Sequence, residues 1–149
     1  MVKTFQFKTK RGSKIGLTNK PLADFKPPKD ETVIEPVQGV MPDSKEEYFV
    51  AKALERAKVD FIYQFDIAGG RAFRGGQVID FMVYTVPLPT PVFVQGDYWH
   101  GGVRSAQTRF NVMMAEHLLR GQAQKPVELW DYELPDIETT YQVVKRKVL

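Results

Sequence analysis

The sequence predicts a single-domain α/β protein, and three observations support this prediction. Helical and extended segments alternate along residues 44–149, as they do in proteins in which helices cover a β-sheet. The length of 149 residues suits one domain, and at this size one core buries roughly two thirds of the unfolded chain's surface. The apolar content of 43% and the charged content of 26% are ordinary for a globular protein.

The first helix is predicted from Ser44 to about Lys58. Ser44-Lys-Glu-Glu47 fits a capping box, in which Ser44 accepts a bond from the helix backbone and Glu47 reaches back toward Ser44. Apolar residues then recur at helical spacing: Phe49, Val50, Ala53, Leu54 and Ala57. Glu47 shares the face of Val50, Ala51 and Leu54, so we expect it to point toward the sheet. The capping role would also account for this glutamate.

Strands are predicted at residues 59–67, 77–86, 92–95 and 126–131, because apolar and β-branched residues gather there. The first two flank glycine pairs at 69–70 and 75–76, and we expect them to form a hairpin. The third is apolar on both faces, which is typical of a central strand.

A second helix is predicted from about Ser105 to Arg120, ending at the favourable C′ residue Gly121. Its buried face should consist of Phe110, Met113, Met114 and Leu118. His117 falls on the same stripe, and we interpret it as a core histidine. A short terminal helix is expected within residues 139–149, so the element order is α-β-β-β-α-β.

Residues 1–43 are predicted to form an extended basic arm, followed by a domain at residues 44–149. Prolines and glycines are dense between residues 12 and 42 and block regular structure, although weak alternation in residues 1–10 allows an edge strand. Residues 1–29 carry eight basic residues against Asp24 alone, a net charge of +7, whereas the whole chain has +3. Such an arm could hold a polyanion near an acidic body, and a solvated terminus explains it equally well.

The composition also excludes some classes of protein. The chain has no cysteine, which rules out disulfides and thiolate metal sites and fits a reducing compartment. No apolar run approaches 18 residues, so we expect no membrane span, and the basic start lacks the apolar stretch of a secretory signal. We therefore expect a cytoplasmic protein, in a bacterium or a phage-infected host cell.

Asp80 is the first candidate for chemistry, because it lies inside the otherwise apolar strand Val78-Ile-Asp-Phe-Met-Val83. A carboxylate is costly to bury unless it is paired, hydrogen-bonded or bound to a cation. A ligand for Mg²⁺ or Mn²⁺ is one natural role. The alternative is an aspartate on a solvent-facing side of the strand.

The segment Gln95-Gly-Asp-Tyr-Trp-His-Gly-Gly102 is the second candidate. His100 can act as a general acid or base, Asp97 can supply an oxygen ligand, and Trp99 can stack on a base or sugar. A polar loop that closes the end of the core is the alternative interpretation.

Basic residues beside flexible glycines suit contacts with phosphate. We predict a nucleic-acid-binding set that includes Trp99 and the basic residues Arg71, Arg74, Arg104, Arg109, Lys8, Lys10 and Arg11.

Together these segments resemble one family. Their order is similar to that in very-short-patch mismatch repair endonucleases and EDxHD homing endonucleases. The segments that carry the resemblance are helix 44–54, the strand Val59–Gln64, Gly76-Gln-Val-Ile-Asp-Phe81, Val92-Phe-Val-Gln-Gly-Asp-Tyr-Trp-His-Gly101 and Pro126–Leu134. Both belong to the PD-(D/E)XK nuclease superfamily. The likeness covers residues 44–134, and its most specific part is the strand that runs into Tyr-Trp-His.

The resemblance implies a restriction-endonuclease-like α-β-β-β-α-β core with a mixed four-stranded sheet flanked by helices. It implies hydrolysis of DNA with Mg²⁺ or Mn²⁺, in which Asp80 binds the metal and the backbone near Val94 supplies a further metal contact. Asp97 is a candidate additional ligand. Glu47 corresponds to the glutamate of the first helix and His100 to the catalytic histidine.

The chain departs from the family at two positions, which puts activity in question. Phe110 stands where the family has an acidic residue early in the second helix, and Gln95 stands where many relatives have an acid or a polar ligand. A non-catalytic nucleic-acid-binding or assembly protein on a degraded nuclease fold is therefore the alternative to a DNA endonuclease or nickase. A third hypothesis is an unrelated, phage-like α/β module whose arm docks into a larger complex. A homodimer would suit cleavage of both DNA strands.

Overall fold

The computed structural model describes residues 3–4, 32–72, 74, 76–96 and 102–149, with the side chains of residues 3–4 and 102–105 left out. In chain order, the helices are α2 (Lys45–Arg56), α3 (Gly102–Leu118) and α4 (Ile137–Lys147). The strands are β1 (Lys3–Thr4), β2 (Val33–Ile34), β3 (Phe61–Ile67), β4 (Gln77–Val83), β5 (Thr90–Gln95) and β6 (Val127–Trp130). Short 3-10 turns occur at η2 (Gly70–Ala72) and η4 (Asp131–Glu133).

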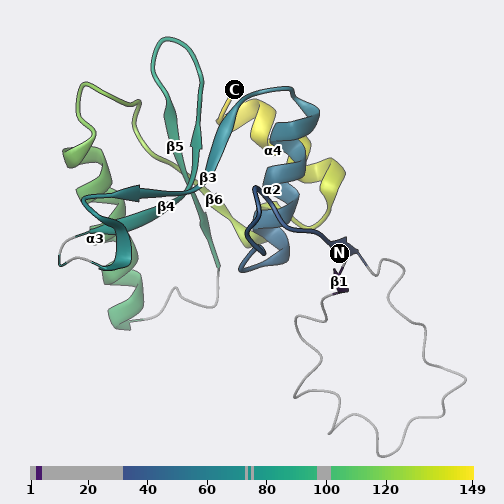
Figure 1. Cartoon of the computed structure of the whole chain (residues 1–149), viewed down its shortest axis with the longest axis horizontal. Coiled ribbons are helices and arrows are strands. Elements are labelled where there is room, and N and C mark those ends of the chain that lie inside the picture. The colour runs from purple at the N-terminus through teal and green to yellow at the C-terminus, as the bar shows by residue number, and fades with distance from the viewer. Residues whose placement is uncertain (1–2, 5–31, 73, 75, 97–101) are drawn as a thin grey trace, which may run out of the picture.

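The main sheet has four strands in the order β3-β4-β5-β6. β3, β4 and β5 pair antiparallel as a meander, whereas β5 and β6 pair parallel because the chain crosses over through α3. Helices α2 and α4 lie on one side of the sheet and α3 on the other (Figure 1). The predicted mixed sheet, the hairpin of its first two strands and the interior position of β5 are confirmed.

The face covered by α2 and α4 carries the larger core. Phe49, Val50 and Leu54 of α2 are at most 5% exposed and pack in one cluster with Phe81, Leu129 and Val144. Burial of each large apolar side chain contributes roughly 1.5–3 kcal/mol of transfer free energy. The apolar stripe predicted for the first helix is thus confirmed.

The face covered by α3 differs from the prediction. Ala115 is buried, and Val112 and Leu119 pack beside it against Ile79 and Phe93. Most of the stripe expected to be buried is exposed: Phe110 is 55% exposed, Met113 66% and Leu118 38%, and His117 is also exposed, whereas Met114 is partly buried. The prediction of the inner face of this helix, including a core histidine, was wrong. Ala115, Val112 and Leu119 face the sheet, whereas Phe110 and Met113 face outward.

The last part of the predicted arm packs on the domain. Ile34 and Val37 are 0% and 2% exposed and belong to the core under α2, with Met41 packed against them. Lys3 and Thr4 pair antiparallel with Ile34 and Val33. Burial of these apolar side chains explains why residues 32–43 remain on the body despite their prolines.

Several boundaries moved from their predicted places. The second strand ends at Val83 rather than residue 86, and the second helix begins at Gly102 rather than near residue 105. The terminal helix begins at Ile137, where Asp136 caps it by accepting a bond from the Thr139 N–H (2.7 Å). In the part of the chain that is described, no helix has the length and apolarity to cross a membrane.

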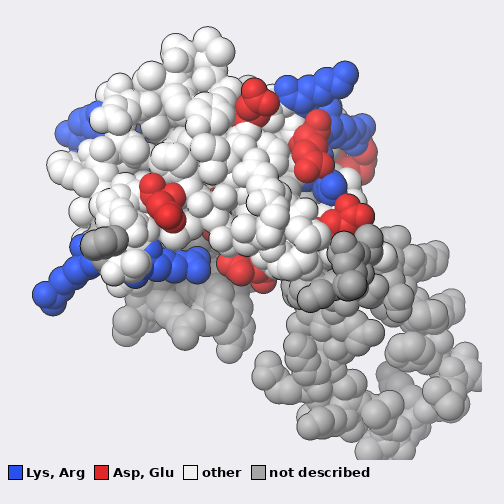
Figure 2. Space-filling model, in the orientation of Figure 1, with Lys and Arg blue, Asp and Glu red and all other residues white. Residues whose placement is uncertain are grey.

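Charge on the visible surface is mixed rather than of one sign. Figure 2 shows basic side chains toward both margins of the molecule and acidic side chains between and beside them. Some of these pair across helices, as Arg56 does with Glu138 at 2.6 Å. Exposed pairs of this kind contribute little to stability, about 0–1 kcal/mol.

Candidate functional site

The first carboxylate of the site comes from the start of α2. Ser44 caps the helix, and its hydroxyl accepts a bond from the Glu47 N–H at 3.2 Å. The cap fixes the helix start, and the apolar stripe fixes its rotation, so Glu47 in the first turn faces the sheet. Glu47 is 5% exposed, as the sequence predicted for this face. Its side chain contacts the Ser44 hydroxyl at 3.5 Å, but it also meets Asp80.

The second carboxylate comes from a break in the sheet. β3 and β4 pair from Phe61↔Val83 to Tyr63↔Phe81 and again from Phe65↔Ile79, so the pair formed by Gln64 and Asp80 is missing from the ladder. Gln64 has a φ of 56°, in the left-handed region. A non-glycine residue adopts this conformation only at a cost, of about 1–2 kcal/mol.

The break reverses which side chains face each helix. Tyr63 and Phe81 pack in the core under α2, whereas Phe65 and Ile79 pack in the core under α3. Strict alternation would put all four on one face. Because the alternation fails between them, Asp80 can lie on the α2 face next to Phe81, where it meets Glu47.

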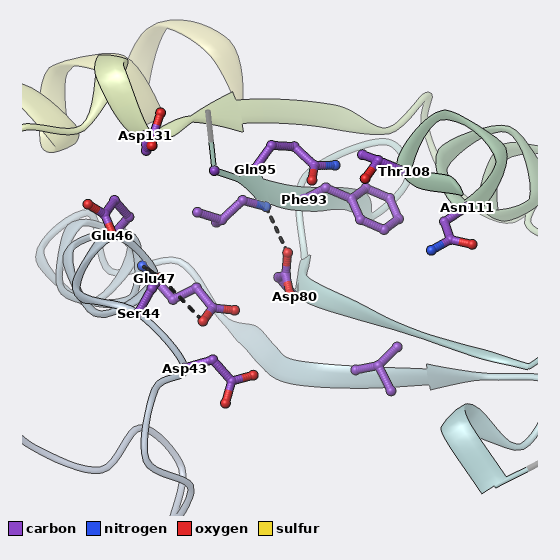
Figure 3. A pocket seen from close by; sticks show the side chains of 13 residues that line it. Asp43, Ser44, Glu46, Glu47, Asp80, Phe93, Gln95, Thr108, Asn111 and Asp131 are labelled. Atoms are coloured by element: carbon purple, nitrogen blue, oxygen red, sulfur yellow. Dashed lines mark hydrogen bonds between the residues drawn. The ribbon is translucent and has the colours of Figure 1, made fainter. Parts of the chain in front are cut away.

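A fork between β4 and β5 leaves room for Asp80. Their pairing ends at Phe81↔Val92, and beyond it the Val94 N–H donates to the Asp80 Oδ2 atom at 2.8 Å. The carboxylate thus takes the place of a strand partner. Figure 3 shows the Glu47 and Asp80 carboxyl groups turned toward each other beside this bond.

Burial dominates the protonation of the pair. Desolvation, followed by the charge of Asp80 and a hydrogen bond to it, raises the pKa of Glu47 from 4.5 to about 9. Desolvation also raises the pKa of Asp80, against the opposing effect of the bonds from Val94 and Glu47. Two adjacent buried carboxyl groups cannot both ionise cheaply. The hydrogen bond between the two groups raises the pKa of Glu47 and lowers that of Asp80, so Glu47 is the group that holds its proton more tightly.

A third acidic residue, Asp43, lies at the edge of the pair. Its N–H donates to the Tyr63 hydroxyl at 3.4 Å, and its Oδ2 atom accepts from the Gln64 side-chain amide at 3.4 Å. The charge of Asp43 raises the pKa of both Glu47 and Asp80. Gln64 therefore contributes to the site in two ways: its left-handed backbone accompanies the break in the ladder, and its side-chain amide binds Asp43.

Asp43, Glu47 and Asp80 line a cavity of about 400 Å³. It opens at the carboxyl ends of the parallel strands β5 and β6, where crevices of open α/β sheets bind their ligands. α2 contributes its first turn, and α3 contributes Thr108 and Asn111 at the opposite end (Figure 3). Gln95 of β5 and Asp131 after β6 complete the polar lining.

Of the predicted catalytic and metal residues, the structure brings together Glu47, Asp80 and Val94. Asp97 and His100 lie outside the described residues, so their predicted roles remain predictions. Within the predicted nucleic-acid-binding set, the side chains of Trp99, Arg104, Lys8, Lys10 and Arg11 likewise lie outside the described part of the chain.

The remaining predicted contacts to nucleic acid are on the surface. Arg71, Arg74 and Arg109 are all exposed, and none of them lines the cavity. Arg71 nevertheless lies close enough to Asp80 for its charge to lower the pKa of that carboxyl.

Sequence reasoning missed part of the lining. Asp43 had been assigned to the arm, and Asp131 and Asn111 had not been considered. Gln95 was noted only as a departure from a family pattern, yet its side chain lies in the cavity and contacts Glu128 at 3.5 Å. Positions just before a helix cap and just after a strand end were the available signals, because such residues converge at one edge of a sheet.

The donor set fits a hard divalent cation with many water ligands. Among the described residues, no three His, Asp or Glu side chains gather closely enough to hold a metal ion by themselves. Mg²⁺ is usually bound through one or two carboxylates and several waters. Glu47 and Asp80 supply two adjacent carboxyl groups, which form a doubly negative pair when both are ionised.

Comparison of the chain with protein-family models, with curated proteins and with solved structures finds no match in any of the three. The functional interpretation therefore depends on the site itself.

Proposed function

We propose that this chain is a metal-dependent phosphodiester hydrolase that nicks or cleaves DNA. The observation that carries the proposal is the contact between the buried carboxyl group of Glu47 and the partly buried carboxyl group of Asp80 at the fork between β4 and β5, in a cavity of about 400 Å³. Two carboxyl groups held against each other away from water cost stability, because each disfavours ionisation of the other. A site that performs chemistry gives a reason to keep both.

The order of elements supports the same class of protein. α2-β3-β4-β5-α3-β6, with an antiparallel meander and a parallel fourth strand, is the order expected of a restriction-endonuclease-like core. The pair comes from the first helix and the second strand of this order, as the resemblance implies. Fold likeness alone does not establish activity, so the carboxyl pair carries the argument.

The chain's own residues have distinct roles in the proposed reaction. Glu47 and Asp80 would hold Mg²⁺ or Mn²⁺, which when bound would stabilise the negative charge on a phosphodiester. The Val94 N–H fixes the orientation of Asp80. A water molecule gives up a proton as its oxygen adds to phosphorus, one P–O ester bond breaks, and the leaving oxygen takes up a proton. His100 is the proposed general acid–base for these proton transfers.

The proposal is tested by incubating the full chain with supercoiled plasmid, with and without Mg²⁺ or Mn²⁺. We expect relaxed or linear product only with the metal. Asp80→Asn should abolish cleavage while the protein still unfolds cooperatively, because the amide cannot replace the carboxylate as a charged ligand. His100→Ala should slow turnover by roughly 10²–10⁴-fold, the usual contribution of general acid–base help.

Matched controls come from exposed acids. Asp60→Asn makes the same chemical change at an exposed position before β3, and Glu55→Gln makes it at the exposed end of α2. Both should cleave at the wild-type rate. Cleavage by Asp80→Asn would remove Asp80 from the mechanism. DNA binding without cleavage under any metal condition would favour the non-catalytic alternative.

A further inference from the structure

A pair of parallel aromatic rings lies beside the cavity and has no part in the proposed chemistry. The rings of Trp130 and Tyr132 are within 5° of parallel, and their centroids are 6.5 Å apart. Tyr132 is 66% exposed and Trp130 is partly exposed. Burial of apolar surface therefore does not explain why these two side chains are aligned on the surface.

The position of the two rings is fixed relative to the site. Trp130 is the Cα partner of Gln95 in the β5–β6 ladder, and Asp131 stands between the two aromatic residues in sequence. Gln95 and Asp131 both line the cavity that contains the carboxyl pair. The backbone that carries the aromatic pair therefore borders the cavity, and the rings themselves are not part of its lining.

The backbone that carries the rings is held from both sides. The Trp130 N–H donates to the Glu133 Oε2 atom at 3.0 Å, and the Glu133 Oε1 atom accepts from Lys147 of α4 at 2.6 Å. The turn η4 is thereby tied to the last turn of α4. Rigid aromatic side chains lose little conformational entropy on binding, which suits a stacking surface.

Positive charge lies next to Glu133, the residue that follows Tyr132. The last turn of α4 carries Lys145, Arg146 and Lys147, and the charges of Lys147 and Arg146 lower the pKa of Glu133. The helix dipole accounts for basic residues at this end, but not for two exposed rings on the turn that Lys147 contacts. Aromatic faces next to basic side chains are the combination that binds single-stranded nucleic acid, with bases on the rings and phosphates on the charges.

We infer that Tyr132 and Trp130 form a stacking platform for an unpaired nucleobase, so that the preferred DNA has a single-stranded segment beside the phosphate held at the cavity. The choice of DNA as the ligand rests on the proposed function. The platform itself acts in binding and needs neither a metal ion nor the carboxyl pair. A mismatch, a flap or a junction would present such a base, whereas an intact duplex would not.

The test measures binding in EDTA, where cleavage cannot occur, with a fluorescent 20-nucleotide oligo(dT) and a 20-base-pair duplex. Tyr132→Ala should weaken oligo(dT) binding about 5- to 100-fold, the range expected for loss of one stacked base, and should change duplex binding less than about twofold. Tyr132→Phe should bind like the wild type because it keeps the ring. Tyr84→Ala removes another exposed tyrosine, 47% exposed, and should have no effect.

A second measurement tests whether the basic residues at the end of α4 contact the phosphates of the DNA. Arg146→Ala should reduce the slope of log affinity for oligo(dT) against log salt by about 0.7, the value for one phosphate contact on a single strand. An unchanged slope, or equal loss of single-strand and duplex binding in Tyr132→Ala, would overturn the platform.

The two proposals fail separately. Asp80→Asn should keep oligo(dT) binding while it loses cleavage. A wild-type chain that binds oligo(dT) through Tyr132 but cleaves no DNA would support the platform and overturn the hydrolase. Metal-dependent cleavage, together with oligo(dT) binding that is unchanged in Tyr132→Ala, would support the hydrolase and overturn the platform.

Discussion

The two faces of the sheet differ in what they bury. Under α2 and α4 the core contains large apolar side chains, including Phe49 and Leu54, together with the Glu47–Asp80 pair. Under α3 the cluster is smaller, and the helix turns Phe110 and Met113 toward solvent. The face that carries the candidate site is thus also the face with the deeper core. A deep core can hold two carboxyl groups together, because the surrounding burial stabilises the fold despite their cost.

The largest effect on stability is expected from a pair of leucine variants, one on each face of the sheet. Leu54→Ala removes a side chain that is 0% exposed and should lower the free energy of unfolding by about 2–5 kcal/mol. Leu118→Ala, at a position 38% exposed on α3, should lower it by less than about 1 kcal/mol. Urea unfolding of both variants measures the difference. Equal losses would mean that the α3 face is as deeply packed as the α2 face.

The pH dependence of stability should reveal the carboxyl pair. The pKa of Glu47 rises on folding from 4.5 to about 9, so between these pH values the folded state holds more protons than the unfolded state. The unfolding free energy should therefore fall as pH rises across this window, by up to about 1.4 kcal/mol per pH unit. Glu47→Gln has no proton to lose, so its profile should be flatter and its stability near pH 8 should exceed that of the wild type.

Urea unfolding at pH 5 and pH 8 measures this slope. The control Glu55→Gln, on the same helix but exposed, should retain the wild-type pH dependence. Parallel profiles for Glu47→Gln and the wild type would show that Glu47 is not held protonated by burial.

A smaller effect should distinguish the break in the ladder from a regular strand position. At Gln64, with a φ of 56°, glycine should be tolerated better than valine by about 1–2 kcal/mol, because only glycine avoids the steric cost. At Asp66, a paired position of the same strand, the preference should reverse, since β-branched residues favour strands. Thermal unfolding of the four variants gives both comparisons. A preference for valine at both positions would remove the left-handed conformation from the explanation of the site.

The smallest effect should come from the residue that the sequence placed in the core. Phe110→Ala should change the unfolding free energy by no more than about 0.5 kcal/mol, because the side chain is 55% exposed. A buried phenylalanine would cost about 3–5 kcal/mol. Chemical unfolding decides between these values, and a large loss would restore the sequence-based orientation of α3.

Much of the fold could be predicted from the sequence because the signals were local. The Ser44 cap and the apolar stripe of α2 lie within a few turns of one helix, and the element order follows from segment lengths and glycines. The orientation of α3 could not be predicted, because Phe110 and Ala115 offer two rival stripes and burial favours the larger side chains. The sheet beneath α3 accommodates small and polar residues, including Thr108 and Asn111 at the cavity.

The same distinction between local signals and tertiary contacts applies to the candidate site. The sequence by itself determined that Asp80 lies in an apolar strand and that Glu47 lies on the inner face of its helix, because both statements depend on short-range periodicity. Only the tertiary structure decided that the two carboxyl groups meet. Their contact requires the missing Gln64–Asp80 pair, the reversal of faces along β3 and β4, and the fork at Val94. Each of these depends on how neighbouring strands pair, and a single strand's sequence does not specify its partner's register.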